Sequence, residues 1–415
     1  MSEHPPTDLV YEGQLEAQLL HVLKTGPVDF RRLVVQAEGA YPTDVLAVLR
    51  KLESSGAVTE GQNQLWVRTD SASRPCVREA GADESAVCRD DSDFPEPHPL
   101  DFDWRFSRRT LELLDQRIAG LECARVAVLG APTLFKFLVD HAKAAHLFDR
   151  NEQIVHYLTR VGYKAVTRCD LFRFSPRSRF SCVVADPPWY LDHYRAFTEG
   201  ARRLLAPKGK LLLSVLPRLT RPCAELDRSE ILRFASERGF DLVGTEPASL
   251  QYLSPPFEME ALKSEGLSVS TWRSGDLYTF VLTKRHVPEY RVDYSEEHKL
   301  WRTWSVGRSV VKVKWDGTHG RGRFDFQTVS GAGGMRLRSV SRRSPLRSKI
   351  NLWTSRNIAL HVSRPDLVCA ALELLLEGHQ CEDIAKGLMN AEQLSEPEVE
   401  RLKEFLNILI DESKS

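Results

Sequence analysis

The sequence of 415 residues carries no net charge, because 57 lysines and arginines are balanced by 57 aspartates and glutamates. No overall field therefore attracts nucleic acid, and any such attraction must come from a local cluster of cations. No apolar run comes near the roughly 20 residues that span a bilayer. The start of the chain also lacks the basic-then-apolar pattern of a secretory signal. We therefore expect no membrane segment and a cytoplasmic location.

Closely spaced cysteine pairs are also missing. The eight cysteines form no Cys-x-x-Cys pair, which is the spacing typical of zinc sites, so we expect no metal. Their scatter favours a reducing compartment. Apolar residues make up 42% and charged residues 27% of the chain, as in ordinary soluble globular proteins. The length allows two or three domains.

Residues 10–67 have the pattern of a small winged-helix domain. Apolar residues at helical spacing predict helices near residues 15–23 and 30–34, and Thr43 is the expected N-cap of a third. Two short strands should follow and form the wing. Such units often enter a DNA major groove, but the third helix offers only Arg50 and Lys51 as cations. A scaffolding or protein-contact role therefore stays open. Residues 68–98 predict a flexible linker, because bulky apolar residues are almost absent there.

Residues 99–290 alternate between strand-like and helix-like segments, which predicts an α/β fold. Short apolar runs end at or just before Gly130, Asp149, Asp170 and Asp186. Later apolar runs predict further strands, and the last two could form an antiparallel hairpin that closes the sheet.

Residues 298–356 form a basic, Trp-rich region with 14 lysines and arginines and only two acids. The tryptophans are Trp301, Trp304, Trp315 and Trp353. Cations neutralise phosphates and Trp rings stack on unpaired bases, so the region favours a nucleic-acid partner. A β domain with core tryptophans and a solvated basic face is the alternative, and such a face could also contact an acidic protein. Residues 357–415 are acidic and predicted to be helical, which makes the C-terminal region α+β.

The most informative motif is Asp186-Pro187-Pro188-Trp189, which directly follows the apolar run 180–185. Prolines lack an N–H and hold φ near −65°, so they end a strand and stiffen the turn. The predicted result is a rigid loop at the carboxyl end of a strand, where open α/β sheets bind ligands. An ordinary turn with an exposed Trp is the alternative. The motif is typical of methyltransferases that act on an amino nitrogen.

The loop has the groups that this chemistry needs. The Asp186 carboxylate and the Pro187 carbonyl would accept hydrogen bonds from an NH₂ group, raise its electron density and align it for transfer. Trp189 would stack on the ring that carries the amine, after base flipping if the target lies in a duplex. For a lysine acceptor, Trp189 would instead line a channel for the aliphatic stem.

Three further positions suit S-adenosylmethionine (SAM) as cofactor. The predicted first strand is followed by the turn Gly130-Ala131-Pro132-Thr133, where the backbone can approach the methionine end. Asp149 ends the second strand, close to the ~20-residue spacing at which an acid accepts from ribose hydroxyls. Asp170 follows the third strand and would meet the adenine amino group.

The stretch from Phe102 to about Leu216 resembles the N6-adenine-methyltransferase-like family, which includes an rRNA adenine methyltransferase with CCHC-type zinc fingers and a lysine methyltransferase of elongation factor 1A. The matching segments are Trp104-Arg-Phe-Ser107 with Thr110, Arg125–Phe135, Phe148-Asp-Arg150 and Val184–Trp189. The resemblance implies a Rossmann-like class I SAM-dependent methyltransferase. It also implies adenine N6 of RNA or DNA as the acceptor, with a protein lysine as the alternative.

Two departures and two other hypotheses accompany this resemblance. The family usually has Phe at the position of Trp189, and its rRNA member's zinc fingers are absent here. A winged helix joined to a Rossmann domain with an Asp-Pro-Pro loop also resembles branched-chain polyamine synthases, which are aminopropyltransferases. Their acidic Gly-Asp-Asp-Asp turn corresponds to the Gly130–Thr133 turn, which has no carboxylate. A catalytically dead binding module is the remaining hypothesis.

Overall fold

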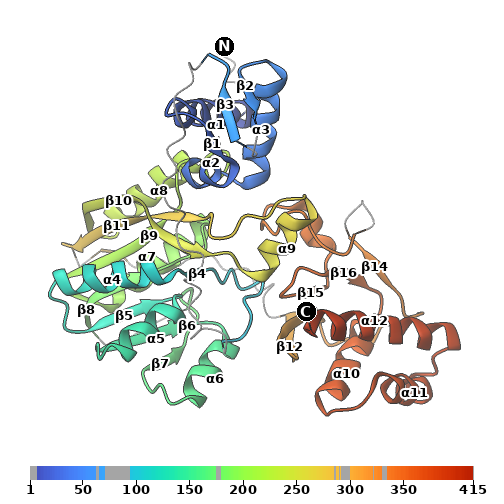
Figure 1. The fold of residues 1–415 in the computed structure, drawn as a ribbon. Coiled ribbons are helices and arrows are strands. Elements are labelled where there is room, and N and C mark those ends of the chain that lie inside the picture. The colour runs from blue at the N-terminus through green and yellow to red at the C-terminus, as the bar shows by residue number, and fades with distance from the viewer. Residues whose placement is uncertain are drawn as a thin grey trace. The chain divides into compact units, whose positions relative to one another are not determined.

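A computed structural model describes residues 7–61, 65–70, 94–173, 179–284, 287–288, 290, 300–320, 322–329 and 334–414. The chain divides into two compact units (Figure 1). The first contains residues 1–93, 105–254 and 269–293, and the second contains residues 94–104, 255–268 and 294–415. Among the described residues, no helix is both long and apolar enough to cross a bilayer.

The first unit begins with a small domain of helices and short strands. Its elements are α1 (Thr7–Leu23), β1 (Val28–Asp29), α2 (Phe30–Gln36), α3 (Pro42–Ser54), β2 (Val58–Glu60) and β3 (Leu65–Arg68). The strands form an antiparallel sheet in the order β1-β3-β2, and Trp66 is buried in the core. Thr43 is not the cap of α3, because Tyr41 occupies the N-cap and Pro42 the first helical position. Proline is well suited to that position, since its φ is already helical.

The rest of the first unit is built around a mixed sheet. Its strands are β4 (Arg105–Phe106), β5 (Val126–Leu129), β6 (Ala145–Asp149), β7 (Val166–Arg168), β8 (Phe180–Ala185), β9 (Leu205–Val215), β10 (Phe240–Leu253) and β11 (Ser274–Leu282). Its helices are α4 (Arg108–Gly120), α5 (Pro132–Asp140), α6 (Glu152–Arg160), α7 (Leu191–Leu204) and α8 (Ala224–Glu237). The strand order is β4-β10-β11-β9-β8-β5-β6-β7.

Strands β7, β6, β5, β8 and β9 are parallel, and β11 is inserted antiparallel between β9 and β10. This order confirms the predicted α/β, Rossmann-like fold class. The central strands β5 and β8 are almost wholly apolar and buried, which is expected when helices cover both faces of a sheet.

The second unit combines an antiparallel sheet with helices. Its elements are α9 (Pro256–Ser264), β12 (Trp301–Val306), β13 (Ser309–Lys314), β14 (Phe326–Thr328), a 3₁₀ helix (Pro345–Lys349), β15 (Leu352–Thr354), β16 (Ala359–Val362), α10 (Pro365–Leu376), α11 (Cys381–Glu392) and α12 (Glu396–Lys414). The sheet has the order β12-β13-β15-β16-β14. One apolar core joins strand residues such as Val311 to helix residues such as Phe405. The predicted separate regions 298–356 and 357–415 therefore share a core.

The tryptophans of the basic region differ from the expected base-stacking platform. Trp353 is fully buried and Trp304 is 7% exposed. Trp301 and Trp315 pack partly buried against the apolar clusters. The expectation that these rings stack on bases is therefore wrong for Trp304 and Trp353, because the strands need large apolar side chains to fill the space beneath the helices.

The predicted linker and the predicted 99–290 domain also have different limits. Phe94 and His98 are buried, and the His98 Nε2 lies 2.9 Å from the carbonyl oxygen of Trp353. Burial is the main cause that lowers the pKa of His98 to about 3. Residues 94–98 are thus part of the second unit, and residues 255–268 also belong to it. Residues 71–93, including the acidic run 89–93, lie outside the described residues.

Candidate active site

The carboxyl ends of neighbouring parallel strands bring the predicted site residues into one row. The strands lie in the order β8-β5-β6-β7. Asp186 follows β8, Gly130 follows β5, Asp149 ends β6 and Asp170 lies just past β7. Because parallel strands end at the same edge of a sheet, these positions lie along one edge, where open α/β sheets bind their ligands. The fold therefore assembles what the sequence shows only as separate strand ends.

The turn at Gly130 is closed tightly against the Asp186 loop. The Gly130 N–H donates to the Phe148 carbonyl at 3.2 Å, and the Asp186 N–H donates to the Leu129 carbonyl at 3.1 Å. Gly130 has φ +68°, and a Cβ there would lie 3.0 Å from the Phe197 ring and 3.2 Å from the Asp186 carbonyl oxygen. Only glycine satisfies both the backbone angle and the space.

Helix α5 begins directly after this turn, with Ala131 as N-cap, Pro132 as the first helical residue and Thr133 buried behind it. A helix N-terminus presents N–H groups without intrahelical partners and favours negative charge. The turn and the helix start thus place backbone N–H groups without intrahelical partners at the end of β5.

Two carboxylates follow on the next strand ends. Asp149 is 9% exposed, and its Oδ1 accepts a hydrogen bond from the Asn151 N–H at 2.7 Å. The Oδ1 of Asp170 accepts from the Phe172 N–H at 3.1 Å. The Cys169 N–H donates to the Asp149 carbonyl at 2.8 Å. Burial, followed by the charges of Asp170 and Asp149, raises the pKa of the Cys169 thiol to about 12. The thiol therefore stays neutral between two acceptor groups that suit the hydroxyls and amine of an adenosine.

The Asp186 carboxylate is held by a buried tyrosine. The Tyr252 hydroxyl donates to the Asp186 Oδ1 at 2.7 Å and lies 2.6 Å from the Ser214 Oγ. Burial, and then the negative charge of Asp186, raises the pKa of Tyr252 well above its usual value. Tyr252 therefore remains a donor, and its oxygen can in turn accept from Ser214. The chain Ser214–Tyr252–Asp186 fixes the orientation of the carboxylate.

Trp189, which the sequence predicts to stack on the acceptor ring, is packed inward in the structure. The side chain is 5% exposed, and its edge contacts the Tyr252 ring with centroids 5.8 Å apart. The guanidinium of Arg273 lies 3.9 Å from the Trp189 ring centroid. Gly275 makes room for this packing, since a Cβ there would lie 3.3 Å from Trp189. The partly exposed planar group at this position is therefore Arg273.

The two prolines hold the turn between these side chains. Pro187 and Pro188 follow Asp186 without helical or strand structure, and the Tyr190 N–H donates to the Pro188 carbonyl at 2.7 Å. Helix α7 starts at Leu191. The loop therefore has the rigid strand-to-helix geometry that the prolines predict, while the binding roles of its residues stay predictions.

Sequence reasoning missed Tyr252, Ser214 and Arg273. Ser214 lies on β9, Tyr252 on β10 and Arg273 just before β11, and none belongs to a short motif. The pairing of β11 with both β9 and β10 brings them to the Asp186 loop. The pairing of the last strands is the feature that would have predicted the positions of these three residues.

The site region matches a known protein family. Residues 103–239 match the family model described as "Probable N6-adenine methyltransferase". This segment contains all the predicted site residues, and the match confirms the resemblance seen in the sequence. No curated protein matches the chain.

Solved structures with a similar fold include the branched-chain polyamine synthase of Thermus thermophilus in complex with N4-aminopropylspermidine and 5'-methylthioadenosine. It has 13% identity and a TM-score of 0.52, over 69% of this chain and 91% of that chain. Its C9 mutein has 14% identity and a TM-score of 0.53, over 69% and 90%. The N-methyltransferase NodS of Bradyrhizobium japonicum WM9 has 16% identity and a TM-score of 0.30, over 42% and 95%.

The sheet order, the row of strand-end residues and the family match together define the class. The protein contains an enzyme domain of the Rossmann-like, SAM-dependent methyltransferase class. Within that domain, residues 103–239 are similar to the N6-adenine methyltransferase family model.

Proposed function

We propose that the protein transfers a methyl group from SAM to the N6 amino group of adenine in RNA or DNA. The observation that carries this proposal is Asp186 at the end of β8, whose carboxylate accepts from Tyr252 and whose backbone carbonyl lies beside the Gly130 turn. This carboxylate lies within the segment that matches the N6-adenine methyltransferase model. An acceptor amine held by Asp186 would therefore sit next to the cofactor turn.

The residues at the strand ends suit the cofactor. When bound, SAM supplies an electrophilic methyl group on a sulfonium. The backbone of the Gly130–Thr133 turn would hold its methionine part, Asp149 would accept from the ribose hydroxyls and Asp170 would accept from the adenine amino group. The left-handed Gly130 and the absence of a Cβ at the turn are the features that favour this fit.

The acceptor is activated by hydrogen bonding and alignment rather than by a strong base. A ring amine is a poor nucleophile because its lone pair is delocalised. Asp186 and the Pro187 carbonyl would accept its two N–H groups and draw electron density onto nitrogen. Tyr252 occupies one acceptor position of the Asp186 carboxylate, which has further lone pairs for the amine. Preorganised groups of this kind account for most of the rate gain in such sites.

Arg273 is the proposed stacking surface for the acceptor base. Its guanidinium lies over the Trp189 ring, and the residue as a whole is partly exposed although its Nε is buried. A guanidinium plane stacks well on aromatic rings, and RNA bases are recognised in this way. Trp189 would then pack against the face of the Arg273 guanidinium that points away from the base.

Nucleic acid is the proposed partner of the second unit. Residues 326–365 contain eight lysines and arginines and no acid. Arg342, Arg343 and Lys349 are exposed there, and together they can neutralise backbone phosphates.

One assay separates the acceptor classes. Labelled SAM should place label on total nucleic acid, and mass spectrometry should find N6-methyladenine, whereas the Asp186→Asn variant should transfer about 10²- to 10³-fold more slowly. Label on protein alone would favour the lysine hypothesis. Absence of both label and SAM binding would favour a dead binding module.

A matched pair of variants tests the nucleic-acid surface. The double variant Arg342→Glu and Arg343→Glu should bind a labelled oligonucleotide more weakly. In a plot of the logarithm of the binding constant against the logarithm of the salt concentration, the slope should become shallower by roughly 2, one unit for each lost phosphate contact. Lys386→Glu is the control, because Lys386 is exposed on the acidic α11 of the same unit. Equal effects of both changes would contradict the assignment.

Aminopropyl transfer to a polyamine is the second candidate. The fold shared over 91% of the branched-chain polyamine synthase favours it, whereas the uncharged Gly130–Thr133 turn speaks against a cationic acceptor. Decarboxylated SAM with spermidine tests it directly, because an aminopropylated product would support it and an absence of product beside active methyl transfer would exclude it.

A further inference from the structure

The N-terminal domain, residues 7–70, has few cations to offer to a nucleic acid. It contains nine acids and six lysines or arginines. Arg50 pairs with Glu53 and Glu60, each at 2.8 Å, and Lys51 pairs with Glu12 at 2.6 Å. The cations of α3 are therefore neutralised by the domain itself, so a docking role on phosphates has no support there.

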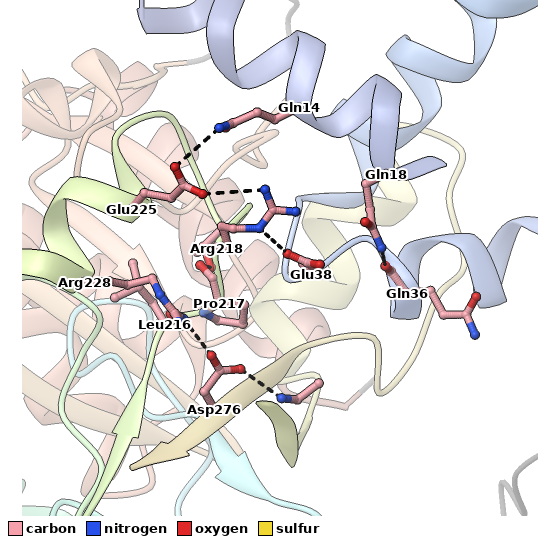
Figure 2. A network of polar contacts seen from close by, with 12 residues as sticks. Gln14, Gln18, Gln36, Glu38, Leu216, Pro217, Arg218, Glu225, Arg228 and Asp276 are labelled. Carbon is pink, nitrogen blue, oxygen red and sulfur yellow. Dashed lines mark hydrogen bonds and ion pairs between the residues drawn. The ribbon is translucent and has the colours of Figure 1, made fainter. Parts of the chain in front are cut away.

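The same domain makes close contacts with the loop Leu216–Cys223, which follows β9. The Leu219 N–H donates to the Glu38 carbonyl at 3.0 Å, and the Arg218 Nε donates to the Glu38 Oε2 at 2.7 Å (Figure 2). Gly39 has φ +84°, and a Cβ there would lie 2.9 Å from the Thr220 Oγ1 and 3.0 Å from Pro217. The α2–α3 turn therefore fits against this loop without spare space.

A second contact comes from α1. The Gln14 Nε2 lies 3.4 Å from the Glu225 Oε2, and Glu225 also faces Arg218, with 3.6 Å between the Oε1 and the guanidinium nitrogen (Figure 2). The loop and the start of α8 are thus held by one polar network that originates in the N-terminal domain.

The domain also contacts the segment Val269–Arg273, which precedes β11. The Tyr41 ring packs edge-on against Trp272, with centroids 5.5 Å apart. The Arg31 guanidinium donates to the Thr271 Oγ1 at 3.4 Å. Thr271 has φ +50°, which a β-branched residue adopts only where its surroundings impose it. The next residue after Trp272 is Arg273, which covers Trp189.

Both segments reach the acceptor side of the candidate active site. The Tyr194 hydroxyl accepts from the Leu216 N–H at 2.9 Å, so the loop starts next to the helix that follows the Asp186–Trp189 turn. Further along the loop, Arg221 lies over the Tyr190 ring at 5.6 Å. Each segment therefore has one side on the N-terminal domain and the other on residues beside Asp186.

We propose that the N-terminal domain is a positioning element of the acceptor site. Its α2–α3 turn, residues 37–41, holds the Leu216–Cys223 loop and the Val269–Arg273 segment, and through them it sets the places of Arg221 and Arg273. The predicted effect on acceptor kinetics rests on the proposed function, whereas the predicted effect on the loop and the segment does not. Its predicted signature is a change in acceptor use without a change in SAM affinity.

Gly39→Ala in the full chain is the direct test, with Gly56→Ala as matched control. Both glycines have positive φ, at +84° and +76°, but a Cβ at Gly56 meets nothing within 4 Å. Both variants therefore carry backbone strain, and only Gly39→Ala pushes on the loop. Hydrogen exchange should speed up in residues 216–223 and 269–273 for Gly39→Ala alone. Acceptor kcat/KM should fall about 10- to 100-fold, as expected for a misplacement of about 1 Å, while the SAM dissociation constant stays unchanged.

A charge reversal covers the case in which Gly39→Ala does not fold. Glu38→Arg and Arg218→Glu should each speed up exchange at the Leu219 amide, and the double variant should restore protection. Equal exchange for Gly39→Ala and Gly56→Ala, or no restoration in the double variant, would overturn the inference. Altered exchange without methyl transfer to any acceptor would instead count against the proposed function alone.

Discussion

The two halves of the candidate active site are built in different ways. On the cofactor half, Asp149 and Asp170 bond to backbone groups two residues further along the chain. On the acceptor half, Asp186 bonds to Tyr252, 66 residues away, and Glu38 reaches Arg218, 180 residues away. Under the proposed function, cofactor binding would therefore depend on local strand ends, whereas acceptor binding would depend on how distant segments pack.

This difference explains why the motif defines the chemistry better than the substrate. The row of strand ends is present in any protein with this sheet, and its groups need only short turns to be placed. The acceptor half adds a tyrosine, an arginine and a separate domain, and a change in any of them alters the pocket while the strand ends stay the same. Substitutions that affect one half alone are the sharpest test of this comparison.

The largest effect is expected for Asp186→Asn. The change keeps the shape and the Tyr252 contact but removes the charge that draws electron density onto the acceptor nitrogen. Methyl transfer should fall about 10²- to 10³-fold, the range seen when one preorganised group is removed. Single-turnover transfer and calorimetric SAM binding measure the two halves separately. A loss of SAM affinity would show that Asp186 acts in cofactor binding, and would contradict the separation into two halves.

Asp149→Asn should have the opposite pattern. A carboxylate that accepts hydroxyl hydrogen bonds contributes roughly 1.5–3 kcal/mol, so the SAM dissociation constant should rise about 10- to 100-fold. Acceptor KM at saturating SAM should not change. Asp241→Asn, at an exposed position on β10, is the control. A variant with normal SAM affinity and poor acceptor use would show that the halves are not separate.

Tyr252→Phe should lower kcat about 10-fold, because it removes one hydrogen bond to the Asp186 carboxylate. Since burial and Asp186 raise the pKa of Tyr252 well above its usual value, the hydroxyl stays protonated up to about pH 10. The wild-type pH profile should therefore show no falling limb from this group. A falling limb near neutral pH that disappears in Tyr252→Phe would contradict the donor role.

Arg273→Ala should give the smallest effect, a roughly 3- to 10-fold rise in acceptor KM, as expected for the loss of one stacking contact. Arg273→Lys should not restore the wild-type value, since lysine lacks the planar group. Steady-state kinetics with an adenine-containing oligonucleotide measures both. Full rescue by lysine would assign Arg273 a role in charge alone.

The sequence predicts the parts of the fold that local patterns determine. Apolar runs place the ends of β5, β6 and β8 within a residue of their observed ends, because buried parallel strands are continuously apolar. The cofactor half follows from these strand ends. The inward packing of Trp189 does not, since it depends on Gly275 and Tyr252 from strands that pair only in the folded sheet.

In the second unit too, the sequence predicts the elements but not the surfaces against which they pack. The apolar faces of α10 and α12 are visible in the sequence as helical spacing, but their partner is not. Leu372, Leu402 and Phe405 pack in one core with strand residues from before residue 356. Periodicity identifies which face of a helix is buried, whereas the surface that covers it depends on tertiary packing.

A complex with S-adenosylhomocysteine tests the central claim most directly, because it locates the cofactor against both halves at once. The account predicts the ribose hydroxyls within about 2.6–3.2 Å of the Asp149 carboxylate, the methionine part on the Gly130–Thr133 turn, and the sulfur on the side that faces Asp186. A ligand bound away from this row of strand ends, or with its sulfur turned away from Asp186, would contradict it.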